Sequence, residues 1–155
     1  SVSLIPILPA STDPMTIEAM PQSIQEVVAH TRKLYDYAGF HEPWVGYLAI
    51  DDADDHIVGT CGFKSRPSGG RVEIAYYTFP ENEGRGIATA MARALVALAQ
   101  DADPEVSVIA QTQPQEGPST RILEKLSFQK LGAVEHPEDG TIWEWEAPRT
   151  TSGNG

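Results

Sequence analysis

The chain has 155 residues, of which 41% are hydrophobic and 21% charged, and its formal net charge is -11 at pH 7. This length favours one domain around a single buried core. No run approaches the roughly 20 apolar residues of a membrane span, so we expect neither a membrane protein nor a membrane partner. With 11 basic residues against 22 acidic ones, we expect no nucleic-acid partner, because such binding depends on clustered Lys and Arg.

The cysteine, histidine and aspartate residues limit the redox and metal chemistry that we expect. Cys61 is the only cysteine, so no intrachain disulfide can form, and the chain fits a reducing compartment such as the cytoplasm. The four histidines are scattered without ligand spacing, which argues against a metal. The acidic run 51–55 lacks the spacing of an EF-hand loop, so we expect a solvated turn rather than a calcium site.

Hydrophobic periodicity predicts ten elements, which begin with an edge strand in the first ten residues, "SVSLIPILPA". That segment lacks the basic region of a signal peptide and contains two prolines, so we expect no export. The remaining elements follow in chain order: a helix over 21–38, strands over 44–51, 56–64 and 71–79, a helix after the turn 84–89, a strand over 105–112, a helix over 116–128, and strands over 128–136 and 141–147. We expect residues 148–155 to form a flexible C-terminal tail.

The turn "GRGIAT", residues 84–89, is a candidate phosphate site. It lacks the Lys of a P-loop and the third glycine of a dinucleotide-binding turn. Its glycines allow close approach of a ligand to the backbone, and the amides that start the following helix could hold a pyrophosphate. An ordinary tight turn with hydrated amides explains this stretch equally well.

Two longer segments favour the phosphate site over the ordinary turn. "EIAYYTFPENEGRGIATAMARALVALA" and "STRILEKLSF", together with the element order, resemble the GNAT superfamily of acyl-CoA-dependent N-acetyltransferases over residues 3–147. Gly84 and Gly86 match the family's Q/R-x-x-G-x-G/A pattern, with Glu81 in the first place. In the second motif, Glu116 replaces Asn and Ser127 replaces Gly.

The resemblance implies a single domain over residues 1–147 and an α/β (α+β) fold. Its mixed, mostly antiparallel, twisted sheet would have six to seven strands, with helices on both faces and the fourth and fifth strands splayed apart. Pro80 on one side of the opening and Thr112 to Pro114 on the other offer a cause for the splay.

The resemblance also implies site residues. Binding of acetyl-CoA, the expected cosubstrate, falls to the backbone of Tyr77, Thr78 and Phe79 for the pantetheine arm, and to Gly84, Arg85, Gly86, Ile87, Ala88 and Thr89 for the pyrophosphate. Glu73 would be the general base, the alternative being a structural ion pair with Arg71 or another neighbour. Leu123 stands where many members have a tyrosine acid, so Ser119 or a water would return the proton. The acceptor pocket would be built from Tyr35, Phe40, His41 and Trp44.

We therefore expect an acyltransferase that moves an acetyl group directly from acetyl-CoA to a primary amine, without a metal. The "LEKLSF" segment resembles the branch that acetylates protein N-termini and small-molecule amines. The alternative is a domain that binds acyl-CoA without catalysis, as a sensor or interaction module. A monomer and a homodimer are both compatible with the sequence.

Overall fold

The computed structural model describes residues 1–11 and 20–149. Its elements, in chain order, are β1 (Val2–Pro6), α1 (Gln22–Ala38), β2 (Gly46–Asp51), β3 (His56–Phe63), β4 (Arg71–Thr78), the 3-10 helix η2 (Pro80–Asn82), α2 (Ile87–Ala102), β5 (Ser107–Thr112), α3 (Pro118–Lys125), β6 (Gln129–His136) and β7 (Gly140–Glu146). All ten predicted elements are present and in the predicted order. Residues 150–155 of the predicted tail lie outside the described residues.

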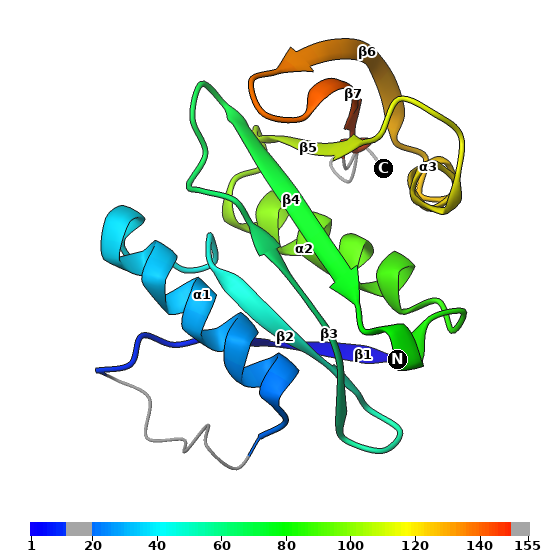
Figure 1. Ribbon diagram of the computed structural model, residues 1–155. Helices are drawn as coiled ribbons and strands as arrows, with labels where there is room; N and C mark the ends of the chain where they lie inside the picture. Colours follow the sequence, from blue (N-terminus) through cyan, green and yellow to red (C-terminus); the bar gives the residue numbers. More distant parts are fainter. Residues whose placement is uncertain (12–19, 150–155) are drawn as a thin grey trace.

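The strands form one seven-stranded sheet in the order β1-β2-β3-β4-β5-β7-β6. Each neighbouring pair is antiparallel except β4 and β5, which run parallel. The first strand lies at one edge, as predicted, and β6 lies at the other (Figure 1). This arrangement confirms the expected mixed, mostly antiparallel sheet.

The two long helices cover opposite faces of the sheet (Figure 1). Alternate residues of β2 point to opposite faces, and Leu48 packs in a cluster with Val28 of α1, whereas Ala49 belongs to the main core with Leu95 of α2. The main core therefore lies between the sheet and α2. On the other face, α1 covers β2 and β3 and leaves room beside β4.

The splay between β4 and β5 is present but begins earlier than expected. The two strands pair only over Arg71–Glu73 and Ser107–Ile109. Beyond this point β4 stays paired with β3, and β5 pairs with β7, so each strand continues with its other neighbour. Pro80 and Thr112 to Pro114 lie beyond the point of separation, so our expectation that they cause it is wrong.

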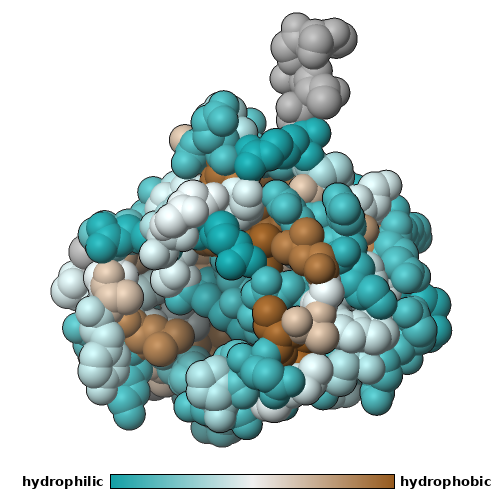
Figure 2. Space-filling model, turned by 90° about the horizontal axis from the view of Figure 1, so that it is seen from above, coloured by the Kyte–Doolittle hydropathy of each residue, from teal (hydrophilic) through white to brown (hydrophobic). Residues whose placement is uncertain are grey.

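The surface is predominantly polar on the face seen in Figure 2, where separate hydrophobic patches border a central depression. Among residues 1–11 and 20–149, none of the helices has the length and hydropathy required to cross a bilayer.

Candidate active site

The opening between β4 and β5 contains a cavity of about 160 Å³ that brings the two predicted catalytic residues together. Glu73 reaches it from the last paired residue of β4, and Ser119 from the first turn of α3. Lys64, Tyr76 and Gln111 are among its other lining residues. A carboxylate, an ammonium group and two hydroxyls therefore surround the point where the sheet opens.

The nearest charged partner of Glu73 is Lys64, whose Nζ lies 2.5 Å from Glu73 Oε2. The antiparallel register of β3 and β4 places these residues opposite one another, and the Lys64 amide donates to the Glu73 carbonyl at 2.9 Å. Arg71, the neighbour named in the sequence analysis, pairs instead with Glu144 at 2.9 Å. Oε2 is buried and makes no directed hydrogen bond among the described residues, so the contact is an ion pair without directed geometry.

The backbone of β4 offers hydrogen-bonding groups to the opening at alternate residues. The amide of Phe79 donates to Val58 and its carbonyl accepts from Asn82, so the expectation that the Phe79 backbone is free for a ligand is wrong. Because strand groups alternate in direction, the amides and carbonyls of Tyr76 and Thr78 face the opening. Those of Tyr77 face β3, so the expectation for the Tyr77 backbone is wrong as well. The Thr78 hydroxyl oxygen is buried and lacks a hydrogen-bond partner among the described residues.

The turn before α2 presents a row of unused amides. Helix α2 begins at Ile87, with Gly86 as its N-cap at φ 77° and Gly84 at φ 80°, conformations that favour glycine. The first helical hydrogen bond runs from the Ala90 amide to the Gly86 carbonyl. Within the described part of the chain, the amides from Gly84 to Thr89 donate to no acceptor. The space in which a Cβ at Gly84 or Gly86 would lie is open, so a ligand can approach the backbone closely.

Arg85 is held by the protein rather than directed at this open space. Its guanidinium pairs with Asp51 at the end of β2 and donates to Asn82 at 3.0 Å. Asp51 is only 5% exposed, so the expectation of a fully solvated acidic turn is wrong for this residue. A hydrogen bond from the Ala53 amide lowers the pKa of Asp51, with a further contribution from Arg85 and an opposing one from desolvation.

A larger cavity of about 640 Å³ lies between α1 and the strands β3 and β4. Tyr35, His41 and Trp44, three of the four residues predicted for an acceptor pocket, are among its lining residues. Phe40 does not; it packs edge-on against Tyr35 with ring centroids 5.3 Å apart and lines a neighbouring cavity. The Tyr35 hydroxyl donates to the Ile7 carbonyl and accepts from the Gly46 amide, so this residue offers the cavity mainly its ring.

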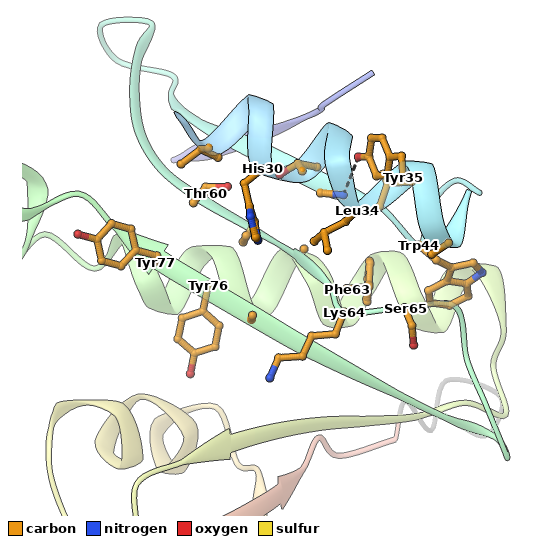
Figure 3. Close-up of a pocket in the computed structure, with 18 of the residues that line it drawn as sticks. His30, Leu34, Tyr35, Trp44, Thr60, Phe63, Lys64, Ser65, Tyr76 and Tyr77 are labelled. Atoms are coloured by element: carbon orange, nitrogen blue, oxygen red, sulfur yellow. Dashed lines mark hydrogen bonds between the residues drawn. The ribbon is translucent and has the colours of Figure 1, made fainter. Parts of the chain in front are cut away.

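The two cavities meet at Lys64, Ala75 and Tyr76, which line both. Figure 3 shows His30 and Leu34 projecting from α1 towards β4, while the Lys64 side chain crosses β4 towards the side that carries β5. Lys64, Tyr76 and His30 were missed in the sequence analysis. The strand register would have indicated Lys64, but the residues between β3 and β4 left that register open.

Burial sets the protonation of two side chains beside these cavities. It raises the pKa of Tyr76 to about 12, so its hydroxyl keeps its proton at neutral pH. It raises the pKa of Cys61 to about 12 as well, which fits the expected packed thiol rather than a nucleophile. Residues 1–11 and 20–149 contain no group of three side chains suited to hold a metal ion.

Comparisons with known proteins agree with this architecture. The family model described as an acetyltransferase (GNAT) domain matches residues 7–129. An uncharacterised N-acetyltransferase, p20, of Bacillus licheniformis is 32% identical over 81 residues, which are 52% of this chain and 46% of that protein. The match thus spans less than half of that relative's length.

Solved structures share the fold at low sequence identity. A GnaT-family acetyltransferase from Bordetella pertussis has a TM-score of 0.64 at 20% identity, and the alignment covers 95% of each chain. A ribosomal-protein-S5-alanine acetyltransferase from Vibrio fischeri has a TM-score of 0.65 at 15% identity, over 97% of this chain and 93% of that one.

Proposed function

The chain belongs to the GNAT family of acetyltransferases, since the family model matches residues 7–129, and we propose that it transfers an acetyl group from acetyl-CoA directly to a primary amine. The observation that carries this proposal is the connection of three features: unused amides at the start of α2, an opening between β4 and β5, and a carboxylate at that opening. Acetyl transfer from CoA needs an anion site for the pyrophosphate, then a channel for the pantetheine arm, and a base where that channel ends.

The amides of Gly86 to Thr89 are proposed to hold the pyrophosphate. They stand at the positive end of the α2 dipole, and no protein group uses them in the described chain. The family pattern also fits two residues later than the sequence analysis placed it, with Gly86 and Ala88 in the small-residue positions and Glu83 in the first. This later position agrees better with a helix that begins at Ile87.

The pantetheine arm is proposed to lie in the opening against β4. Tyr76 and Thr78 have backbone groups facing the opening, and Thr78 adds an unpartnered hydroxyl. Hydrogen bonds from these amides would orient the thioester and stabilise the oxyanion that forms as the amine attacks.

Proton transfer is assigned to groups around the small cavity. Glu73 takes the proton from the acceptor ammonium or amine, and a hydroxyl supports the departing thiolate. Ser119 and Tyr76 both border this cavity, so both are candidates for the second role. The Tyr76→Phe and Ser119→Ala variants separate them, because only removal of the active hydroxyl should lower kcat while leaving the Kd for CoA unchanged.

The acceptor is proposed to enter through the large cavity beside α1. Much of its wall is apolar or aromatic, and its acidic members are Glu26 and Glu81, with Lys64 and Arg66 as counterparts. An amine on a partly apolar body, such as a peptide N-terminus or an aromatic amine, suits this wall better than a polycation does.

The reaction is tested by supplying acetyl-CoA with N-terminal peptides, aromatic amines, polyamines and aminoglycosides while release of the CoA thiol is followed. We expect turnover with at least one peptide or aromatic amine. Thermal stabilisation by CoA without turnover on any acceptor would instead support the alternative function, a domain that binds acyl-CoA as a sensor or interaction module.

The role of Glu73 is tested by Glu73→Gln. Loss of the base is expected to lower kcat about 10²- to 10⁴-fold near neutral pH. Glu124→Gln removes the same charge from the exposed side of α3 and is the matched control. An unchanged kcat in Glu73→Gln would remove this residue from the proposed role.

A further inference from the structure

We propose that Lys64 is a self-acetylation site, at which the protein transfers the acetyl group of a bound acyl-CoA to its own side chain when no acceptor is present. This inference rests on the proposed function, because it needs the thioester to enter the opening beside β4. It concerns a residue outside the sequence-predicted site.

The Lys64 amine lies where the proposed mechanism places the amine of an acceptor. Its Nζ lies 2.5 Å from Glu73 Oε2, the proposed base. The residue borders both the large cavity, proposed for the acceptor, and the small cavity at the strand opening. Lys64 thus supplies a primary amine beside the proposed base and on the wall that the two cavities share.

The Lys64 side chain is free enough to move onto a thioester. It is 51% exposed, while the Glu73 side chain is 23% exposed. Its described contact at the amine is the ion pair with Glu73 Oε2, which does not have the geometry of a hydrogen bond. In Figure 3 the side chain extends across β4 towards the half of the sheet where the opening lies.

The remaining lysines stand in different surroundings. Lys33 and Lys125 are exposed on α1 and α3, and Lys130 lies 3.6 Å above the Trp143 ring. These three lysines line neither the large cavity nor the small one. Its place beside the proposed base and at the opening proposed for the thioester therefore distinguishes Lys64 from the rest.

The proposed step conserves atoms and charge. Glu73 accepts one proton from the Lys64 ammonium, and the neutral amine attacks the thioester carbonyl carbon. An N–C bond forms and the C–S bond breaks, so the sulfur leaves as the CoA thiolate. The second proton lost from nitrogen ends on that thiolate. The products are an ε-acetyl-lysine and free CoA, with no oxidant or metal required.

The test is mass spectrometry of the full chain after incubation with acetyl-CoA alone. We expect one acetyl group, mapped by peptide analysis to Lys64 and added at least about tenfold faster than at Lys125. The rate per molecule should not depend on protein concentration, because the reaction is intramolecular. Lys64→Arg, which keeps a cation beside Glu73, should abolish the modification, and Lys33→Arg should leave it unchanged.

Glu73→Gln separates this reaction from adventitious acetylation. A spontaneous reaction of Lys64 with acetyl-CoA does not use Glu73 as a base, so this substitution would leave its rate unchanged. A reaction that uses Glu73 as base should slow by about 10²-fold or more. Acetylation that is spread evenly over the lysines, or is not slowed in Glu73→Gln, would overturn the proposal.

Failure of this inference is distinguishable from failure of the proposed function. Calorimetric titration with CoA and the thiol-release assay on the amine panel are run on the same preparation. If external amines are acetylated while Lys64 stays unmodified, the inference fails and the function stands. If CoA is not bound, both fail.

Discussion

The Arg85–Asp51 pair connects the proposed pyrophosphate turn to the hairpin between β2 and β3. Asp51 Oδ1 accepts from the Ala53 amide, while Oδ2 contacts Arg85. Asn82 accepts a second hydrogen bond from the same guanidinium. A turn that holds a ligand only through its backbone must be fixed by other contacts, so we assign Arg85 a positioning role.

Replacing Asp51 by Asn should weaken this attachment in a pH-dependent way. The pKa of Asp51 is lowered from 3.8, so its stabilising effect is complete above that value and is lost as the pH falls through the lower folded-state pKa. Urea unfolding at pH 7 should show a less stable variant, and the difference from wild type should shrink below about pH 4. Asp52→Asn, at an exposed position in the same turn, is the control. A difference that stays constant with pH would contradict this account.

At the scale of elements, the end of α3 contains Ser127, which stands where the family motif has glycine. The Ser127 amide donates to the Glu124 carbonyl and the Phe128 amide to the Leu123 carbonyl, which is the Schellman arrangement. Ser127 has φ 66°, a conformation that glycine adopts without strain. Leu123 and Phe128 both lie in the main core, so the tertiary packing keeps Ser127 in this conformation.

Ser127→Gly should therefore stabilise the protein by about 0.5–1 kcal/mol, since relief of left-handed strain outweighs the added freedom of the unfolded chain. The free energy of unfolding from urea titration measures this. Ser23→Gly in α1 should instead lower the free energy of unfolding, because glycine is the poorer helix residue. Equal losses in both variants would show that Ser127 is not strained.

Two glycines with left-handed backbone separate the effect of strain on stability from the effect of a side chain on ligand binding. Gly86 has φ 77° and Gly69, in the turn between β3 and β4, has φ 60°, and a Cβ at either meets no atom within 4 Å. Alanine should lower stability by about 1–2 kcal/mol at both sites. Only Gly86→Ala should raise the Kd for CoA, measured calorimetrically, because its Cβ would stand where the pyrophosphate approaches. If Gly86→Ala binds CoA as tightly as the wild type does, the Gly86 turn has only a structural role.

For the whole molecule, the net charge of -11 opposes the approach of an anionic ligand. Arg85, close to the proposed pyrophosphate site, is neutralised by Asp51, and Glu81 and Glu83 are exposed nearby. Long-range repulsion of CoA is therefore expected to exceed local attraction.

The association rate constant of CoA should accordingly rise several-fold as salt increases from about 10 mM to 150 mM, because screening weakens the repulsion. Stopped-flow binding at constant pH measures it. Lys125→Glu, at an exposed position that lines neither cavity, should steepen the rise slightly. A rate constant that falls with salt would indicate attraction by a positive site that the charges named here do not provide.

The sequence alone predicted much of the fold because helical and strand periodicities are local. Val72 and Ile74 are buried and alternate with Glu73, as their pattern predicted. Local periodicity also has a limit: Leu34 shares the helical spacing of the buried residues Ile24 and Val28, but it is 49% exposed and lines the large cavity. Periodicity identifies the apolar face of a helix and does not say whether a neighbour covers its whole length.

The element order and the two faces of the strands could be predicted because they depend on neighbouring residues in the chain, whereas Glu73 became a candidate through the resemblance to a family. The contact of Glu73 with Lys64, that of Arg85 with Asp51 and the paired backbone groups of Phe79 became visible only in the folded chain. These contacts depend on strand register and on where the two halves of the sheet separate. Both are set by packing between segments far apart in sequence, which no local pattern records.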